Sequence, residues 1–252
     1  MTAKFGAEIA GEKTLAHCHI SAAQLEEHVT DPDLKWRRDY RRHPDEAQAH
    51  FIHVDKQPPD WKSRTEAADR SQGYLAYRII SWMEKAKEDR AAGRWAELQE
   101  HLFGLAHYLG DLTMPLHLSS RHDGGEVGLP DLHAQWESKM VHRYEKELKQ
   151  MVTGRLKQEK LPALWSKMAY GDLIMTIAQQ SAGKVDRLFA SARPALTVPR
   201  ISPRAKKNRR HSENATPRFS KPLLFQNTGD LAADQLTIAS RLIGHTLTQI
   251  CQ

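Results

Sequence analysis

The chain has 252 residues, of which 40% are hydrophobic and 27% charged, and its formal net charge is +6. This is an ordinary soluble composition in a chain long enough to bury a core, and we expect one domain over residues 1–252. No apolar run approaches the ~20 residues that a membrane-spanning helix needs, which excludes a membrane-spanning protein. The opening segment MTAKFGAEIAGEKTLAH lacks the apolar stretch of a signal peptide, so we expect no export signal in the chain as given.

Apolar residues recur at intervals of three and four along most of the chain, which is the pattern of amphipathic helices. In chain order, this pattern predicts helices over residues 16–29, 73–92, 95–112, 132–152, 170–192 and 229–250. No segment alternates for long between polar and apolar residues, as a half-buried strand would, and no repeat of fixed period is present. We therefore expect an all-α fold, a single compact multi-helix domain with its site between facing helices.

The two cysteines, Cys18 and Cys251, stand near opposite ends of the chain and form no C-x-x-C pair. Their number and spacing indicate neither a redox motif nor a disulfide framework. We expect two inert thiols.

The positive charge is concentrated between Arg200 and Lys221. This segment holds eight Lys or Arg residues against one Glu, with two prolines and little apolar content, whereas the rest of the chain is close to neutral. The composition predicts a basic flexible insertion at about residues 197–222. It is either a solvated loop or a contact for the phosphates of nucleic acid or anionic lipid, and the sequence does not separate the two.

Potential metal ligands are spaced regularly between residues 107 and 137. His107 and Asp111 are four residues apart, and so are His133 and Glu137, so each pair shares one face if its segment is helical. Pro115 and a Gly-Gly sequence between the pairs predict a helix, a turn and a second helix. Zinc rarely takes a full set of ligands from one segment, so upstream donors are also candidates. They are His17, His19, Asp31, Asp33, His50 and Asp55. Spacing alone leaves a multi-metal site and a set of surface and helix-pairing residues equally open.

These donors belong to a longer motif. HYLGDLTMPLH followed by DLHAQWE resembles the metal-ligand signature of the zinc-dependent bacterial phospholipases C and the related single-strand-specific zinc nucleases. That signature reads H-[YF]-x-x-D-x-x-x-P-x-H, then H-x-x-x-[DE]. Upstream, DPDLKW and EAQAHFIHVD resemble the Asp and the His-aromatic ligand segments of the same superfamily. The resemblance runs from about His17 to Glu145.

The resemblance implies a helical domain that holds two to three zinc ions. If the ligand positions of the family are transferred to this sequence, one ion would be held by Asp33, His50, His107 and Asp111. A second would be held by His117, His133 and Glu137. Asp111 would bridge to a third ion, which in the family is also bound by an early histidine and an N-terminal tryptophan. His17 is preferred over His19 as the early histidine, and Asp33 over Asp39 as the first carboxylate. This sequence has no tryptophan at or near its start.

The activity that the resemblance implies is hydrolysis of a phosphodiester. Asp111 would act as the bridging carboxylate, and Asp33 would both bind a metal and accept a proton from the attacking water. Glu137 is typical of the phospholipases and Trp136 of the nucleases, so the motif does not choose the substrate.

Glu137 together with HFIHVD favours a phospholipase C-like enzyme as the first interpretation. A single-strand-specific nuclease is the alternative, and a third hypothesis is a non-catalytic, zinc-stabilised helical domain that binds nucleic acid or membrane through its basic loop. No protein partner is indicated. The family suggests a secreted or periplasmic protein. The histidines near the motif but off its spacing, His101, His122 and His142, are expected at the surface or in helix pairs.

Overall fold

The computed structural model describes residues 1–158, 162–197 and 218–252. Its α-helices are α1 (Thr2–Ala10), α2 (Glu12–Ala16), α3 (Ala22–His28), α4 (Asp31–Leu34), α5 (Glu46–Ala49), α6 (Leu75–Ala92), α7 (Trp95–Thr113), α8 (Val141–Arg143), α9 (Glu145–Gln158), α10 (Tyr170–Ala182), α11 (Val185–Ala192) and α12 (Lys221–Cys251). Within these ranges the strands are two short ones, β1 (Leu196–Thr197) and β2 (Arg218–Phe219), which pair antiparallel. The predicted all-α fold is confirmed.

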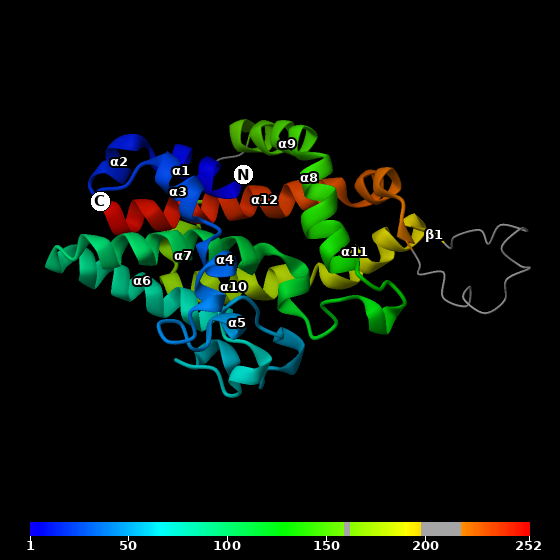
Figure 1. Cartoon of the computed structure of the whole chain (residues 1–252), viewed down its shortest axis with the longest axis horizontal. Coiled ribbons are helices and arrows are strands. Elements are labelled where there is room, and N and C mark those ends of the chain that lie inside the picture. Colours follow the sequence, from blue (N-terminus) through cyan, green and yellow to red (C-terminus); the bar gives the residue numbers. More distant parts are fainter. Residues whose placement is uncertain (159–161, 198–217) are drawn as a thin grey trace, which may run out of the picture.

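Helices α6, α7 and α12 form the centre of the molecule (Figure 1). Leucines 98, 102, 105, 109 and 112 follow the helical repeat along α7 and are all buried, so this helix has a continuous apolar face toward the core. Gly93 ends α6 in the left-handed conformation, with φ 68°, which lets the chain reverse directly into α7. Pro115 follows the last turn of α7 and prevents its continuation.

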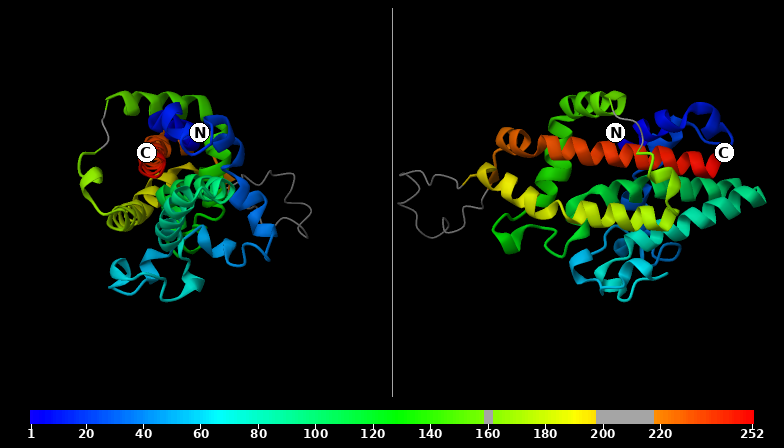
Figure 2. Two further views of the ribbon diagram at one scale, coloured as in Figure 1. Left: turned by 90° about the vertical axis from the view of Figure 1, so that its left-hand side faces the viewer. Right: turned by 180° about the vertical axis from the view of Figure 1, so that it is seen from behind.

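The long helix α12 lies beside both α7 and α1 (Figures 1 and 2). Small residues permit the close approach to α1: a Cβ added at Gly6 would lie 2.4 Å from Cγ2 of Ile243. The C-terminal half of α12 packs into the main hydrophobic core, and its N-terminal half packs against α9, α11 and the segment around Trp136. This one helix thus joins the two apolar clusters. No helix in the described ranges is long and apolar enough to cross a membrane.

The two cysteines are joined. Cys18 and Cys251 form a disulfide with an S–S distance of 2.02 Å, across a sequence separation of 233 residues. The prediction of two inert thiols is therefore wrong. The reason is tertiary: α2 packs against the C-terminal part of α12, and this contact brings the two ends together.

Three predicted helices are interrupted. Residues 132–152 contain a seven-residue π-helix, η7 (Ala134–Met140), before α8 and α9. Residues 170–192 divide into α10 and α11 around Gly183, and within 16–29 the continuous helix is α3. The predicted basic insertion at 197–222 lies largely outside the described residues, because 198–217 fall in the gap; the flanking strands β1 and β2 hold its two ends side by side.

Candidate metal centre

Side chains from several elements meet around the C-terminal end of α7. Asp33 comes from α4, His50 from the residue that ends α5, and His107 and Asp111 from successive turns of α7. His117 lies on the 3-10 helix η5 (Pro115–Leu118), while His133 precedes the π-helix η7 and Glu137 lies within it. The wider turn of a π-helix is often found at functional sites. All predicted ligands except His17 therefore lie in this region.

A first cluster forms around His50. Its Nδ1 lies 3.0 Å from Nε2 of His107 and 2.9 Å from Oδ2 of Asp111. Nε2 of His107 is in turn 3.3 Å from the same Asp111 oxygen. The carboxylate of Asp33 reaches both rings, with an oxygen 3.7 Å from each of these nitrogens. Two imidazole nitrogens and two carboxylates thus converge from three separate segments.

The second cluster consists of His117, His133 and Glu137. Nε2 of His117 lies 3.0 Å from Nε2 of His133, and Oε2 of Glu137 lies 2.7 Å from the His133 nitrogen and 3.5 Å from the His117 nitrogen. The two clusters share Asp111, because its other oxygen, Oδ1, lies 3.4 Å from Nδ1 of His117. That contact is not aligned as a hydrogen bond, and Nδ1 of His117 is buried without a hydrogen-bond partner.

Both clusters have the dimensions of a zinc site. A Zn–N bond of about 2.0–2.1 Å in a tetrahedron places neighbouring ligand atoms about 3.3 Å apart. The three edges of the second cluster, 2.7, 3.0 and 3.5 Å, and those around His50, 2.9 to 3.7 Å, span this value. Neutral imidazoles and ionised carboxylates are also the ligand types that zinc accepts. The residues present therefore fit divalent ions.

A further layer of hydrogen bonds fixes the orientation of the ligand rings. Nδ1–H of His107 donates to the carbonyl of Val29 at 2.8 Å, which leaves Nε2 for the site. Nε2 of His50 bonds Oε1 of Glu46 at 3.2 Å, which leaves Nδ1 for the site. The hydroxyl of Tyr108 donates to the same Glu46 oxygen at 2.5 Å. Partners of this kind select the tautomer of a metal-binding histidine and raise its basicity.

The carboxylates dominate the electrostatics of the centre. Burial lowers the pKa of His107, but Asp111 beside it raises that pKa to about 9. The pKa of His117 is likewise raised to about 9, because Asp111 and Glu137 outweigh the effect of burial. Burial raises the pKa of Glu137, yet His117 lowers it to about 2. The centre thus attracts positive charge strongly, and protons and metal ions compete for the same atoms.

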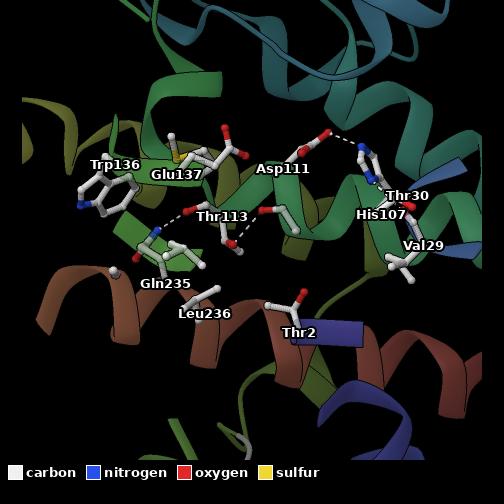
Figure 3. A pocket seen from close by; sticks show the side chains of 15 residues that line it. Thr2, Val29, Thr30, His107, Asp111, Thr113, Trp136, Glu137, Gln235 and Leu236 are labelled. Carbon is white, nitrogen blue, oxygen red and sulfur yellow. Dashed lines mark hydrogen bonds and ion pairs between the residues drawn. The ribbon is translucent and has the colours of Figure 1, made fainter. Parts of the chain in front are cut away.

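Two cavities adjoin the ligands. One of about 160 Å³ is lined by His50, His117 and His133 together with Arg37, Phe51, His53, Leu116 and His122. The other, of about 260 Å³, lies between α7, η7 and α12, with Asp111 and Glu137 at one side and Thr2, Gln235 and Leu236 at the other (Figure 3). Gln235 is fixed there by donating to the carbonyl of Thr113 at 2.6 Å. The metal centre can therefore be approached from two sides.

His17 is placed away from this centre. Its Nδ1 lies 3.3 Å from the carbonyl oxygen of Cys251, next to the disulfide. The alternative, His19, packs its ring 4.2 Å from that of Trp95, at the start of α7. Asp111 is sixteen residues further along the same helix, or about 24 Å at 1.5 Å per residue. The structure therefore brings neither histidine to the site that the sequence predicted.

The two candidates for the first carboxylate are also separated. Asp33 faces His50 and His107, whereas Asp39 accepts a hydrogen bond from the backbone N–H of Arg42 at 3.3 Å and ends a 3-10 turn. Of the other upstream donors, Asp31 pairs with Lys35, and Asp55 accepts from Ser120. These two carboxylates have other partners than the metal centre.

Sequence reasoning missed several residues of the centre. Glu46 precedes His50 by four residues on a short helix, so the i,i+4 spacing used for the other pairs would have found it. Phe51 and Arg37 lack such a signal, because only the fold brings them to one cavity. His122, expected at the surface or in a helix pair, lines the same cavity with its ring 6.4 Å from that of His133. His101 does pair helices, through Asp89 of α6.

Comparison with known proteins agrees with this geometry. A family model described as S1/P1 nuclease matches residues 22–190, about two thirds of the chain, and this range contains both clusters. A comparison with curated proteins found no match. The chain therefore belongs to the S1/P1 nuclease family, within the superfamily of zinc-dependent phospholipases C and nucleases, and is a metal-dependent phosphodiesterase.

Proposed function

We propose that this protein is a zinc-dependent nuclease that hydrolyses phosphodiester bonds in single-stranded nucleic acid. The observation that carries the proposal is the cavity of about 160 Å³, where an aromatic ring and an arginine stand beside three of the predicted ligands. The family match supports a nuclease more directly than the phospholipase C-like enzyme that the motif favoured.

Aromatic rings in this cavity offer a surface for a nucleobase. Phe51 directly follows the ligand His50 and is only partly buried. Its ring stacks on that of His53 with centroids 4.7 Å apart, and the His53 ring is nearly parallel to that of His122 at 5.8 Å. Every base has a flat face, so stacking on such rings binds single strands with little sequence preference. A duplex keeps its bases stacked inside, which favours a single-stranded substrate.

The polar side chains suit the chemistry of phosphodiester hydrolysis. Bound divalent ions would supply a water of lowered pKa and would neutralise charge on the phosphoryl group. The carboxylate of Asp33 faces both His50 and solvent and could accept the proton of the attacking water. Nη2 of Arg37 lies 3.3 Å from Oδ1 of Asp33, within reach of a phosphoryl oxygen bound at the same place.

Solvent access argues against a purely structural metal site. A structural zinc site is closed by its protein ligands, whereas a catalytic one keeps an open position. Here the side chains of Asp33 and Glu137 are 45% and 38% exposed, one in each cluster. Both clusters can therefore meet a substrate. This supports an enzyme over the non-catalytic zinc-stabilised domain.

Phospholipase C activity is a second candidate because of the larger cavity in Figure 3. Much of its wall is apolar, from Ala106, Met114, Val141, Ala232 and Leu236, and it adjoins Asp111 and Glu137. Such a wall suits the glyceride part of a phospholipid as well as it suits a base. Substrate choice is thus the point that the test must decide.

The test compares three substrates with purified zinc-loaded protein: a single-stranded DNA oligonucleotide, the matching duplex and a soluble short-chain phosphatidylcholine. We expect cleavage of the single strand, much slower cleavage of the duplex, no release of phosphocholine, and loss of activity in Asp111→Asn. Phosphocholine release without DNA cleavage would promote the phospholipase. Tightly bound zinc with neither activity would favour the non-catalytic domain.

A further inference from the structure

A basic segment leads away from the metal centre. Residues 37–42 read RRDYRR and begin four residues after Asp33. All four arginines are exposed. Tyr40 between them is 74% exposed, the largest value among the exposed large hydrophobic residues of the described chain. An aromatic ring in water among cations has no packing role, and this combination is typical of surfaces that bind single-stranded nucleic acid.

Two of the four arginines are free to meet phosphates. Arg37 pairs with Asp33, and Arg42 donates to Glu100 at 2.9 Å. Arg38 and Arg41 form no ion pair with any described residue, and the one acid in the segment, Asp39, accepts from backbone instead. Their charges are therefore not neutralised by neighbouring carboxylates.

The segment ends at a third cavity, of about 400 Å³, which lies between α6 and the residues before α5 and is called the α6 cavity below. Tyr74, Arg78, Ser81 and Lys85 face it at successive turns from the start of α6. The charged side chains that line this cavity are four cations and two carboxylates. The cations are Arg42, Arg70, Arg78 and Lys85, and the carboxylates are Asp45 and Glu66. Arg70 pairs with Asp45 at 2.6 Å, and Arg42 pairs with Glu100. Arg78 and Lys85 then remain against Glu66, and this smaller surplus of positive charge still favours an anion such as a phosphate group.

Arg78 is held rigidly at this cavity. Its guanidinium lies over the rings of Tyr74 and Trp82, 5.2 and 5.1 Å from their centroids, and Nη2 donates to the Tyr74 hydroxyl. Among the described residues no carboxylate lies within ion-pair distance of Arg78, and its buried Nε has no hydrogen-bond partner. The guanidinium as a whole is half-buried and lines the cavity, so a fixed cation without a carboxylate partner stands ready to bind a phosphate oxygen there.

The two cavities are close enough for one strand to occupy both. Arg37 lines the cavity at the metal centre, and Arg42 lines the cavity at α6. Five residues of fully extended chain span at most about 18 Å, so the Cα atoms of these arginines lie no further apart than that. A strand leaving the metal centre could thus pass along the exposed arginines to Arg78.

We propose that residues 37–42 and the α6 cavity form a binding track for single-stranded nucleic acid. Arg38, Arg41 and Arg78 contact phosphates, and a base stacks on Tyr40. The track deepens the proposed nuclease function and rests on it for the identity of the strand. It holds the part of the substrate that extends beyond the bond being cleaved. Long strands therefore bind more tightly than dinucleotides, while cleavage of the bound bond is unaffected.

The main variants of the test change exposed residues, so that loss of folding does not confuse the result. Arg38→Gln/Arg41→Gln removes two proposed phosphate contacts, and Lys87→Gln/Lys146→Gln is the matched control that removes two exposed charges from α6 and α9. Zinc-loaded proteins are assayed for kcat and KM on a 15-nucleotide single strand and on a dinucleotide. Strand binding is measured separately, by fluorescence anisotropy in an Asp111→Asn background that does not cleave.

For the arginine variant we expect KM and Kd for the 15-mer to rise roughly tenfold, with kcat and the dinucleotide kinetics unchanged. The slope of log affinity against log salt should become less steep by about 1.4, because each lost phosphate contact on a single strand accounts for about 0.7. Tyr40→Ala should weaken 15-mer binding roughly fivefold or more without changing the salt slope, and Tyr40→Phe should restore it. Arg78→Gln removes one proposed contact, so it should also raise KM and Kd for the 15-mer and should make the salt slope less steep by about 0.7.

Three results would overturn the track. In the first, the wild type cleaves the 15-mer, but the arginine and Tyr40 variants bind it with wild-type Kd and cleave it with wild-type KM. The second is orthophosphate binding that is lost in Arg78→Gln with strand binding intact, which would assign the cavity to free phosphate. The third is a result in which the arginine and Tyr40 variants lose binding to phosphatidylglycerol vesicles but keep binding to the 15-mer. This would assign the surface to a membrane. If the wild type binds the strand through these residues but does not cleave it, the proposed nuclease function fails and the track stands.

Discussion

His50 and Asp111 are 61 residues apart in sequence, yet Nδ1 of the histidine lies 2.9 Å from Oδ2 of the aspartate. The second oxygen of Asp111 faces His117, so this single buried carboxylate connects the two donor clusters. No other carboxylate of the described centre contacts both. The chemistry of the site should therefore depend on Asp111 more than on any other ligand.

Asp111→Asn keeps the size of the side chain and removes its charge. We expect hydrolysis to fall by at least about 100-fold, as for the loss of a group that acts on the transition state. Zinc content should fall as well, because neither His50 nor His117 would face an anionic oxygen of this residue. Asp172→Asn is the control, since Asp172 is exposed on α10 and belongs to neither donor cluster. Elemental analysis and steady-state kinetics of both variants measure these changes, and wild-type zinc with wild-type rates in Asp111→Asn would refute the shared role.

The second cluster should hold its own ion. We predict at least two tightly bound zinc ions per chain and the loss of one in His133→Ala, because only two donors of that cluster would remain. His142→Ala is the matched control, as His142 is exposed on the neighbouring helix α8. The measurement is zinc per chain after purification without chelators. Zinc at background level in the wild type would contradict the metal centre itself.

Glu46 should raise the zinc affinity of the centre without binding metal itself. Glu46→Gln keeps a partner for Nε2 of His50 but removes the negative charge behind the ring. We expect zinc affinity to drop about 10- to 100-fold, the usual cost of losing such a supporting group, with the number of sites unchanged. Competition with a chromogenic chelator measures the affinity. Glu88→Gln, an exposed carboxylate on α6, should leave it unchanged, and an equal effect in both variants would rule out a specific role for Glu46.

The metal-free protein should lose stability as pH rises. His107 and His117 have pKa values raised to about 9 by Asp111 and Glu137, above the ordinary value of 6.5. Their contribution to folding is fully present below about pH 6.5 and is lost as pH passes 9, because the folded state holds these protons more tightly than the unfolded state. Unfolding temperatures in chelator at pH 6.5, 8 and 9.5 should therefore decrease.

Zinc should reverse that trend. Metal and protons compete for the same nitrogens, so zinc affinity rises with pH over this range and the loaded protein gains stability relative to the metal-free one. At acid pH, Glu137 is the group that matters, because its pKa is lowered to about 2. Its contribution to the stability of the folded state is fully present above about pH 4.5 and is lost as pH falls through 2. A metal-free protein whose unfolding temperature is flat from pH 6.5 to 9.5 would contradict the charge pairing at the centre.

The disulfide should contribute to stability rather than to catalysis. Cys18→Ser/Cys251→Ser opens a loop that covers most of the chain, and we expect the free energy of unfolding to fall by about 2–5 kcal/mol. The kinetics of the folded variant should match the wild type, because the bond lies at the far end of α7 from Asp111. Wild-type protein under reducing conditions should unfold at the same denaturant concentration as the variant. Equal stability in oxidised and reduced wild type would show that the bond is not formed in solution.

The sequence by itself determined the helical class and the local geometry of the His107–Asp111 pair, whereas the π-helix that carries Glu137 appeared only in the structure. The four-residue spacing of His107 and Asp111 depends only on the helical repeat. The end of the helix before Pro115 depends only on the proline ring, which removes a backbone N–H donor. The family signature added the partners from other segments. Such features are visible in sequence because the interactions that fix them are local or because their spacing is specific.

Tertiary structure alone decided which distant residues meet. It joined Cys18 to Cys251 and placed His17 beside that disulfide instead of at the metal centre. It also gathered Phe51 and Arg37 into the cavity over the ligands. The physical reason is that these contacts follow from how α12, α7 and α6 pack against one another. That packing depends on burial summed over many apolar side chains, which no single stretch of sequence records.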